Sequence, residues 1–260
     1  MAPPPYTYTH SPSLSPLSTQ PPQSLSTTSN PPIAHLMTSV LILRQPKSQS
    51  QKDSSSSSSQ STTTKASPPP PAEILLLRRS PTDSYPLKWE TPGGSVDPSD
   101  PSVLAAAARE LYEEARLADP HFLAHVGMAP SINADEAARM GEWGIPPDLE
   151  DAKDVDLVAA AGSIEMKVTT FMESGEVWGK MNFLATVDEE AGERVVTDPE
   201  EHLEWGWFTE DEVRRGRAWR RVDGVDDGER REKVLEFTSQ AVWGSILESF
   251  RVGRELGVIV

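Results

Sequence analysis

The feature that most constrains this chain is a Pro-Gly-Gly turn at Pro92–Gly94, followed by an alanine-rich segment that ends in closely spaced glutamates. Residues three and four apart lie on one face of an α-helix, so Glu110, Glu113 and Glu114 are expected to crowd together. Like charges at this spacing repel one another and weaken the helix. A divalent cation bound among them would reverse the sign of that interaction, and magnesium prefers carboxylate oxygens and usually bridges to substrate phosphates. The pattern therefore predicts a magnesium site for phosphate chemistry.

The same segment has the apolar stripe of a helix that packs on a core. At about 100° per residue, one side of the helix carries Leu104, Ala108, Leu111 and Ala115, and the glutamates occupy a neighbouring sector that points away from it. Arg109 precedes Glu113 by four residues, a spacing at which an ion pair can form. The alternative is an acidic face that is simply solvated, as charge runs usually are. The preceding turn and the adjacent Arg109–Glu110 pair favour the metal site.

These residues resemble the Nudix box, the motif G-x5-E-x7-R-E-U-x-E-E-x-G-U of Nudix hydrolases, in which U is a bulky aliphatic residue. Gly94 matches the first glycine of the motif. The second half is matched by Arg109, Glu110, Leu111, Glu113, Glu114 and Leu117. The chain is thus similar to a fungal-type Nudix domain protein with a variant box. The resemblance implies an α/β fold in which a mixed β-sheet is sandwiched between helices.

The box departs from the family pattern at three places. Asp100 stands where the first glutamate is expected, one methylene shorter, and eight residues rather than seven separate it from Arg109. Arg116 takes the place of the glycine that normally ends the helix in a left-handed conformation. That conformation costs a residue with a Cβ roughly 1 kcal/mol. Either the helix ends at Arg116 with this strain, or it continues to Ala118 and the end of the motif is remodelled.

The resemblance also implies roles for the matched residues. Glu113 and Glu114 would ligate Mg²⁺ or Mn²⁺ together with the backbone carbonyl of Gly94. Glu110 would either ligate the metal or act as the catalytic base, and Arg109 would orient an acid rather than contact the substrate. A further carboxylate often comes from a loop outside the helix. The candidates are Glu200, Glu201 and Glu204, which the sequence does not rank and which could equally form a solvated acidic turn.

The sequence assigns no substrate-binding residue, but it contains candidates of three kinds. The cations that could form a basic pocket are Arg78, Arg79, Lys88 and Lys180. The tryptophans that could stack on a nucleobase are Trp89, Trp178, Trp205 and Trp207, of which we expect at most one to do so. His202 is the best placed of the five histidines, either as a base or as a hydrogen-bonding residue of its loop.

The balance of charge limits the class of partner. The formal net charge of the 260-residue chain is -16, which argues against broad binding to nucleic acid or to anionic membranes. A small phosphorylated substrate, above all a nucleotide derivative, is compatible with a local basic pocket. No apolar run approaches the roughly 18 residues of a membrane helix, and no signal peptide is evident. We therefore expect an intracellular protein, cytoplasmic or nuclear.

Composition divides the chain into a tail and a folded domain. Residues 1–34 are rich in Pro, Ser and Thr and contain no Asp, Glu, Lys or Arg, so a disordered tail is expected there. The Nudix-like domain is expected at 35–255, with a low-complexity insertion at 46–72 whose serine run has nothing to pack. Because loop-closure entropy grows slowly with length, strands on either side of the insertion can still pair.

Patterns of apolar residues predict the elements of this domain. Strands are expected at 39–44, 73–79, 166–172 and 180–187, and the stretch 178–183 resembles a central strand of the family. Helical composition is found at 134–140 and 149–161, and the amphipathic pattern of 229–255 indicates a late helix. Thr209 and Glu212 have the spacing of a capping box, which predicts the start of another helix.

These patterns favour a metal-dependent hydrolase that cleaves a phosphoanhydride, as in a nucleoside diphosphate linked to another moiety. The altered loop around Asp100 leaves a second interpretation open, a catalytically silent Nudix-like module that binds a nucleotide or a protein. A third is a scaffold protein whose function lies in the tail. The intact acids of the helix favour the enzyme, and the sequence identifies neither the substrate nor the oligomeric state.

Overall fold

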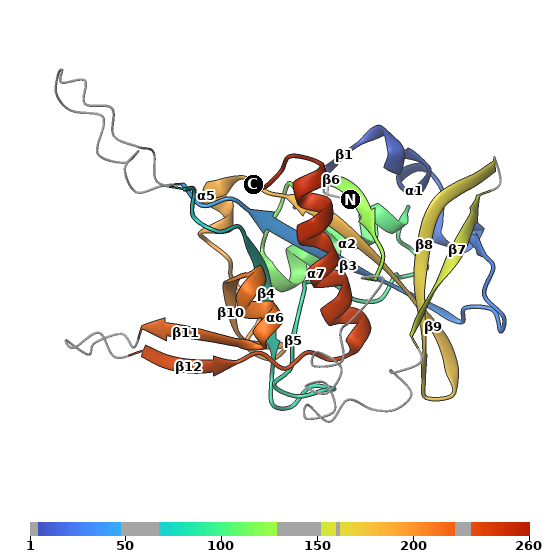
Figure 1. Ribbon diagram of the computed structural model, residues 1–260. Coiled ribbons are helices and arrows are strands. Elements are labelled where there is room, and N and C mark those ends of the chain that lie inside the picture. Colours follow the sequence, from blue (N-terminus) through green and yellow to red (C-terminus); the bar gives the residue numbers. More distant parts are fainter. Residues whose placement is uncertain (1–4, 48–67, 129–151, 160–161, 222–229) are drawn as a thin grey trace, which may run out of the picture.

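The fold is built around one large mixed β-sheet with helices on both faces (Figure 1). The computed structural model describes residues 5–47, 68–128, 152–159, 162–221 and 230–260. Its sheet contains β1 (Thr9–His10), β2 (Ser26–Thr27), β3 (His35–Arg44), β4 (Glu73–Arg79), β5 (Trp89–Glu90), β6 (His121–Val126), β7 (Lys153–Ala159), β8 (Gly162–Glu173), β9 (Glu176–Thr186) and β10 (His202–Thr209). The helices are α1 (Ser15–Thr19), α2 (Val103–Ala115), α5 (Glu189–Gly192), α6 (Glu210–Arg215) and α7 (Gln240–Glu255), with short 3-10 turns at Pro12–Leu14 and Pro22–Ser24.

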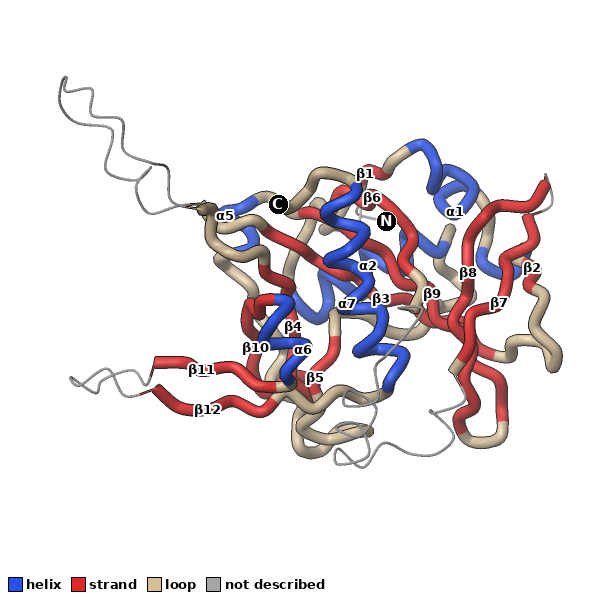
Figure 2. Tube along the Cα trace, viewed as in Figure 1, coloured by secondary structure: helices blue, strands red, loops and turns tan. Residues whose placement is uncertain are grey.

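The order of the strands confirms the mixed α/β architecture. Hydrogen-bonded neighbours follow the path β10-β4-β3-β9-β8-β7-β2, while β5 pairs with β4, and β6 pairs with both β1 and β9. Strands β3 and β9 run parallel, whereas β4 is antiparallel to both β3 and β10. The predicted strands at 39–44, 73–79, 166–172 and 180–187 fall in β3, β4, β8 and β9 respectively. A separate two-stranded sheet of β11 (Arg217–Arg221) and β12 (Arg230–Val234) projects from this body (Figure 2).

Alternation along the central strands divides the core into two layers, because successive strand residues point to opposite faces. Leu41 and Leu43 of β3 lie in the layer covered by α7, and Val40 and Ile42 lie in the layer covered by α2. The α7 layer includes Trp243, Ile246 and Phe250, and the α2 layer includes Leu104, Ala108, Leu111 and Ala115. The apolar stripe predicted for α2 is therefore its buried face, and the sheet is sandwiched between the two helices.

Helix α2 begins and ends with specific caps. The hydroxyl of Ser102 accepts a hydrogen bond from the backbone N–H of Ala105 (3.1 Å), as an N-cap residue does. Arg116 ends the helix in the left-handed region, at φ 56° and ψ 29°, and its N–H donates to the carbonyl of Tyr112 (3.0 Å). Of the two sequence-based alternatives, the structure selects the strained end at Arg116, and the helix does not continue to Ala118.

The segment from residue 5 to residue 34 differs from the disordered tail that its composition predicts. Strand β1 pairs in parallel with β6, and β2 pairs with β7. Leu14 and Leu17 are 1% and 0% exposed and belong to the apolar layer of α2. Tyr8 packs edge-on against Phe122 of β6. The few apolar side chains of this segment are stabilised by an apolar surface that the rest of the domain provides, which a composition average cannot register.

Two further expectations for secondary structure are corrected. Within 149–161, residues 153–159 form strand β7 rather than a helix, because Asp154 and Asp156 alternate with apolar residues and the backbone pairs with β8. Within 229–255, the first residues form β12, and helix α7 starts later, where the hydroxyl of Ser239 accepts a hydrogen bond from the N–H of Val242 (3.1 Å). The helix considered at 134–140 and most of the insertion at 46–72 lie outside the described residues.

Helix α6 follows β10 through the predicted capping box. The Thr209 hydroxyl accepts a hydrogen bond from the N–H of Glu212, and the Glu212 carboxylate accepts one from the N–H of Thr209 (3.0 Å). This reciprocal pair satisfies two amide groups that the first turn of a helix leaves without partners.

Among the described residues, no helix has both the length and the apolar character needed to cross a membrane.

Candidate active site

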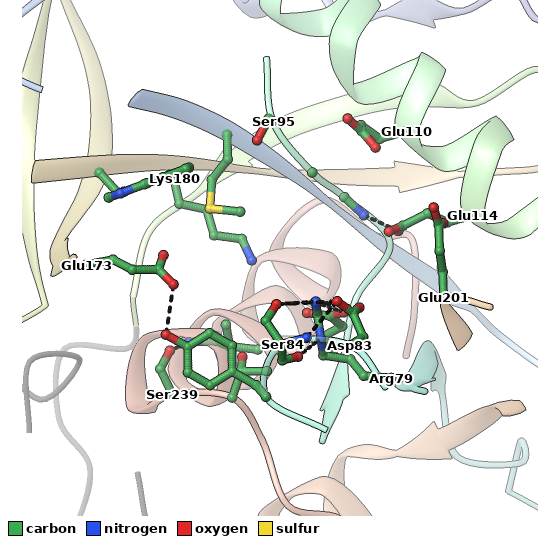
Figure 3. Close-up of a pocket in the computed structure, with 18 of the residues that line it drawn as sticks. Arg79, Asp83, Ser84, Ser95, Glu110, Glu114, Glu173, Lys180, Glu201 and Ser239 are labelled. Carbon is green, nitrogen blue, oxygen red and sulfur yellow. Dashed lines mark hydrogen bonds and ion pairs between the residues drawn. The ribbon is translucent and has the colours of Figure 1, made fainter. Parts of the chain in front are cut away.

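A cleft of about 930 Å³ opens beside the acidic face of α2 (Figure 3). Its walls come from the Pro-Gly-Gly turn, α2, strands β8 and β9, the turn before β10 and the start of α7. Among the residues that the structure describes, nine carboxylates line this cleft: Asp83, Glu90, Glu110, Glu113, Glu114, Glu173, Asp198, Glu200 and Glu201. Three cationic side chains accompany them: Arg79, Arg116 and Lys180. Carboxylates outnumber cations, so an anionic ligand bound here needs additional positive charge.

The two glycines of the turn allow the backbone to approach both β3 and α2. Gly93 has φ +155°, and a Cβ placed there would lie 2.2 Å from the carbonyl oxygen of Thr38. A Cβ at Gly94 would lie 2.6 Å from an oxygen of the Glu110 carboxylate. The N–H of Gly93 donates to Glu114 Oε2 (2.6 Å), and the Gly94 carbonyl accepts from the N–H of Thr38 (2.8 Å). A carbonyl oxygen has two lone pairs, so Gly94 retains one for another partner.

Arg109 organises the acids on the outer part of α2. Its guanidinium donates to Glu110 Oε1 and to Glu113 Oε2, each at 2.9 Å. It also holds Asp100, which stands at the variant position of the motif, through Nε (3.1 Å) and Nη2 (2.9 Å). The predicted ion pair between Arg109 and Glu113 is therefore present, and Arg109 is engaged with carboxylates rather than turned into open space.

The three helix acids differ in exposure and in charge balance. Glu110 and Glu114 are each 12% exposed at the side chain, whereas Glu113 is 52% exposed. Burial raises the pKa of Glu110, and the charge of Arg109 opposes that rise. Burial also raises the pKa of Glu114 well above its usual value, and the neighbouring Glu90 carboxylate adds to the effect. The expected crowding of like charges is thus most severe at Glu114, where the charge of Glu90 adds to the effect of burial.

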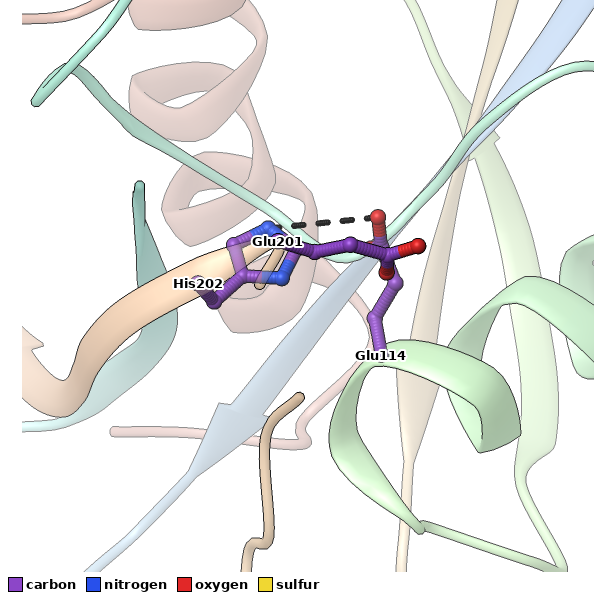
Figure 4. A group of neighbouring side chains, drawn as sticks. All are labelled: Glu114, Glu201 and His202. Atoms are coloured by element: carbon purple, nitrogen blue, oxygen red, sulfur yellow. Dashed lines mark ion pairs between the residues drawn. The ribbon is translucent and has the colours of Figure 1, made fainter. Parts of the chain in front are cut away.

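A loop residue and a histidine meet Glu114 from the opposite wall (Figure 4). Glu114, Glu201 and His202 each offer one ligand atom, and these atoms all lie within 4.8 Å of one another. His202 Nε2 is 3.9 Å from Glu114 Oε1 and 3.5 Å from Glu90 Oε1. The His202 ring is 2% exposed, and neither of its nitrogens has a hydrogen-bond partner among the residues that the structure describes.

The three loop acids considered from the sequence are separated by the fold. Glu200 and Glu201 line the cleft, and Glu201 is the one grouped with Glu114. Glu204 is instead paired with Arg78 at 2.9 Å and with Lys233. The register of β10 against β4 shifts between His202, which lies opposite Arg79, and Glu204, which lies opposite Arg78. Successive residues of β4 point to opposite faces, so this shift places Glu204 on the other face of the sheet from His202. The choice among the three therefore depends on the register of β10 against β4.

The fold also separates the candidate cations and tryptophans into residues that line the cleft and residues that lie elsewhere. Arg79 and Lys180 line the cleft, whereas Arg78 pairs with Glu204 and Lys88 pairs with Glu236 (2.9 Å). Burial lowers the pKa of Lys180, and the nearby carboxylates Glu90 and Glu114 oppose that shift.

Of the four tryptophans, Trp178 lines the cleft, stacked on the ring of His35 at 4.4 Å between centroids. Trp89 lies in the core layer of α7, while Trp205 and Trp207 pack against the layer of α2.

Three residues of the cleft were not singled out by the motif. Glu90 is 7% exposed and accepts a hydrogen bond from Arg79 Nη1 (2.6 Å). Tyr85 donates to Glu173 Oε1 (2.9 Å) across the mouth. The sequence signal that marks Glu90 is its place two residues before Pro92, at the start of the turn. Tyr85 comes from the loop between β4 and β5 and Glu173 from the end of β8, and no local pattern links them.

The family model of the NUDIX domain matches residues 69–225. No curated protein matches the chain, whereas 71 chains of solved structures do. These include a MutT NUDIX hydrolase from Burkholderia pseudomallei, at 19% identity, covering 68% of this chain and 84% of that chain with a TM-score of 0.34.

Two others come from different organisms. An Ap4A hydrolase binary complex from C. elegans is 17% identical, covers 85% of this chain and 98% of that chain, and has a TM-score of 0.39. RenU, a Nudix hydrolase from M. smegmatis, is 17% identical, covers 86% of this chain and 85% of that chain, and has a TM-score of 0.38. The assignment rests on the family model, which spans more than half of the chain and contains the acids of α2. The chain belongs to the NUDIX domain family.

Proposed function

We propose that this Nudix protein is a metal-dependent hydrolase that cleaves a phosphoanhydride, in a nucleoside diphosphate linked to another moiety, with Mg²⁺ or Mn²⁺ as cofactor. One observation carries the proposal, the convergence of carboxylates from two distant elements on one cleft. Glu110, Glu113 and Glu114 come from α2, and Glu201 comes from the turn before β10. A diphosphate entering this cleft would be repelled unless cations offset its charge.

The donor set fits a hard divalent cation. Burial raises the pKa values of Glu110 and Glu114, so these carboxylates lack full compensation for their charge. A cation bound between them would supply it. Carboxylate oxygens and a backbone carbonyl such as that of Gly94 are the ligands that Mg²⁺ and Mn²⁺ prefer. We therefore propose Gly94, Glu110, Glu113 and Glu114 as the metal-binding residues, with Glu201 as the additional acid.

The remaining residues have roles that follow from their contacts. The bound metal would offset the charge of the diphosphate and polarise the phosphorus. Arg109 donates to Glu110 and Glu113, so it acts by orienting these carboxylates. Glu110 either completes the metal site or takes the proton of the attacking water, since a base for this step must lie within hydrogen-bond reach of it. Lys180 lines the cleft and would contact a phosphate.

The proposal concerns a small phosphorylated substrate, above all a nucleotide derivative. Trp178 lines the cleft, and an indole face there can stack on a nucleobase. The excess of carboxylates argues against a long polyanion, because each additional phosphate would need its own cation. Nucleoside diphosphate sugars, dinucleoside polyphosphates and oxidised nucleotides are therefore the classes to test.

A substrate panel tests this function directly. The full-length protein would be incubated with members of each class in Mg²⁺ or Mn²⁺, and the products identified by mass spectrometry in ¹⁸O-labelled water. We expect one class to yield a nucleotide product that carries the label, with no product in excess EDTA. Glu114→Gln should lower turnover by at least about a hundredfold, whereas Glu204→Gln is the matched control, since Glu204 pairs with Arg78 outside the cleft.

The second candidate function is a silent Nudix-like module that binds a nucleotide without cleaving it. The observation in its favour is the variant loop, in which Asp100 replaces a glutamate and pairs with Arg109. In the same panel, this alternative predicts saturable binding of nucleotides by calorimetry and no product with either metal. That outcome would overturn the hydrolase.

A further inference from the structure

We propose that Glu114, Glu201 and His202 form a mixed oxygen–nitrogen metal position, which takes a first-row transition ion such as Mn²⁺ in preference to Mg²⁺. The inference rests on the proposed function in one respect, because it takes Glu114 as a metal ligand. It adds a nitrogen ligand from outside the Nudix box and a preference among metals. Figure 4 shows the His202 ring and the Glu201 carboxylate directed toward Glu114 from the start of β10.

The spacing of the three ligand atoms suits one ion. In octahedral coordination with bonds of about 2.1 Å, neighbouring ligand atoms lie about 3 Å apart and opposite ones about 4.2 Å apart. The carboxylate oxygens and the imidazole nitrogen of the cluster lie within 4.8 Å of one another, and His202 Nε2 is 3.9 Å from Glu114 Oε1. A small side-chain adjustment brings all three atoms to bonding distance of a shared cation.

His202 itself supplies the independent observation. Its ring is 2% exposed, yet Nδ1 and Nε2 have no hydrogen-bond partner among the described residues. A buried polar group without a partner costs free energy, so such groups are rare in folded proteins. Direct pairing with a carboxylate does not resolve the cost, because Glu90 and Glu114 lie 3.5 and 3.9 Å away, beyond hydrogen-bond length. A metal ion bound to a ring nitrogen of His202 would give that nitrogen a partner.

The backbone holds the two new ligands in place. Asp198 begins the turn before β10, and its carbonyl accepts hydrogen bonds from the N–H of Glu201 (3.1 Å) and of His202 (2.7 Å). The carbonyl of Glu201 in turn accepts from the N–H of Ser80 (2.8 Å), which ties the turn to the end of β4. Both side chains are therefore presented by a tight turn on the central sheet rather than by a free loop. Ligands held in this way need little ordering when an ion binds.

The nitrogen ligand accounts for the metal preference. Mg²⁺ demands near-ideal octahedral geometry and takes oxygen ligands and waters. Imidazole suits first-row transition ions, whose affinity for nitrogen-containing sites exceeds that of Mg²⁺. Glu110 and Glu113, which both pair with Arg109, by contrast offer only carboxylate oxygens as ligands. The cleft thus offers an all-oxygen position that Mg²⁺ can fill and a second position that selects a transition ion.

Electron paramagnetic resonance of bound Mn²⁺ in the full-length protein tests this assignment. Spin-echo spectra should show coupling to ¹⁴N, and His202→Gln should remove it. We expect His202→Gln to weaken Mn²⁺ binding by about tenfold or more and Mg²⁺ binding by less than about threefold. His121→Gln is the matched control, because His121 of β6 hydrogen-bonds to Thr9 of β1, and its loss should leave the coupling intact.

The outcomes separate this inference from the proposed function. Mn²⁺ bound to the wild-type protein without ¹⁴N coupling would overturn the mixed site, whatever His202→Gln does to folding. Hydrolysis in Mg²⁺ under that outcome would leave the hydrolase standing. Conversely, ¹⁴N coupling without turnover of any substrate would support the site and refute the hydrolase. Glu201→Gln provides a second variant at an exposed side chain, in which Mn²⁺ affinity should fall while the ¹⁴N coupling persists.

Discussion

Arg109 donates two parallel hydrogen bonds to Asp100, from Nε to Oδ1 at 3.1 Å and from Nη2 to Oδ2 at 2.9 Å. A fork of this kind fixes both the distance and the orientation of a carboxylate. Asp100 is 7% exposed and also accepts a hydrogen bond from the N–H of Asp97 (2.8 Å). The longer loop and the shorter acid of this variant motif therefore still converge on the arginine that positions Glu110 and Glu113.

Neutralising a helix acid should separate catalysis from stability. Glu113→Gln or Glu114→Gln is expected to lower turnover by at least about a hundredfold, because a metal ligand is lost. The free energy of unfolding should stay the same or rise slightly, because repulsion among the carboxylates is relieved. Turnover and denaturant midpoints are the measurements. Activity that survives both substitutions, or that persists in EDTA, would refute the metal mechanism.

The raised pKa of Glu114 predicts a pH dependence of stability in metal-free protein. The folded state holds its proton at pH values where the unfolded chain, with an ordinary value of 4.5, has lost it. Where the folded state binds more protons, stability falls as pH rises. The free energy of unfolding should therefore decrease as pH rises from about 4.5 through the raised pKa of Glu114.

Glu204 provides the control of opposite sign. Burial raises its pKa, but the stronger combined effect of Lys233 and Arg78 lowers it. The free energy of unfolding that Glu204 contributes is present above the ordinary carboxyl pKa and is lost as pH falls through the lowered pKa of Glu204. In urea titrations across pH, Glu114→Gln should flatten the decline at higher pH, and Glu204→Gln should destabilise the protein there. Identical profiles for Glu114→Gln and wild type would contradict the buried charge.

Because α2 ends in a left-handed conformation at Arg116, any residue with a Cβ at this position should make the protein less stable than glycine does. Arg116→Gly should stabilise the protein by a few tenths to about 1 kcal/mol, because glycine adopts positive φ without strain. The arginine also lies over the ring of Tyr112, at 5.2 Å, and loss of that contact offsets part of the gain. Denaturant midpoints give the sign of the change, and turnover should change little.

Arg116→Ala isolates the backbone effect in the same assay. Alanine removes the contact with Tyr112 but keeps the Cβ that makes φ 56° unfavourable. The glycine variant should therefore be more stable than the alanine variant. If the two variants unfold at the same midpoint, the strain assigned to this helix end is absent.

The N-terminal segment should contribute to the stability of the domain. Leu14→Ala and Leu17→Ala each remove a fully buried side chain, which typically costs about 2–5 kcal/mol. Ser13→Ala is the matched control, because Ser13 is exposed in the same turn. Thermal melts of the three variants decide the question. If both leucine variants have the same melting temperature as the wild type, residues 5–34 do not pack as described, and the tail is dispensable.

The sequence predicted what depends on neighbouring residues. Helix α2, its apolar stripe and the pairing of Arg109 with Glu113 follow from the local period of 3.6 residues, and the capping box at Thr209 is likewise local. The strands at 73–79 and 180–187 were visible because each contains a short apolar run, Ile74–Leu77 in the first and Phe183–Ala185 in the second. Helix α7 and strand β7 were misjudged because their limits depend on a cap at Ser239 and on pairing with β8.

The resemblance to the Nudix box therefore located half of the candidate site, the half carried by one helix. Tertiary structure decided the other half. His202 lies opposite Arg79 in the antiparallel register of β10 against β4, and that register sends Glu201 toward α2 while Glu204 pairs with Arg78. A sequence lists three similar acids in one turn without stating which faces Glu114, because that choice depends on strand register and on the packing of two distant elements. The physical reason is that helix periodicity is encoded locally, whereas the convergence of carboxylates and a buried imidazole on one point exists only once the sheet has formed.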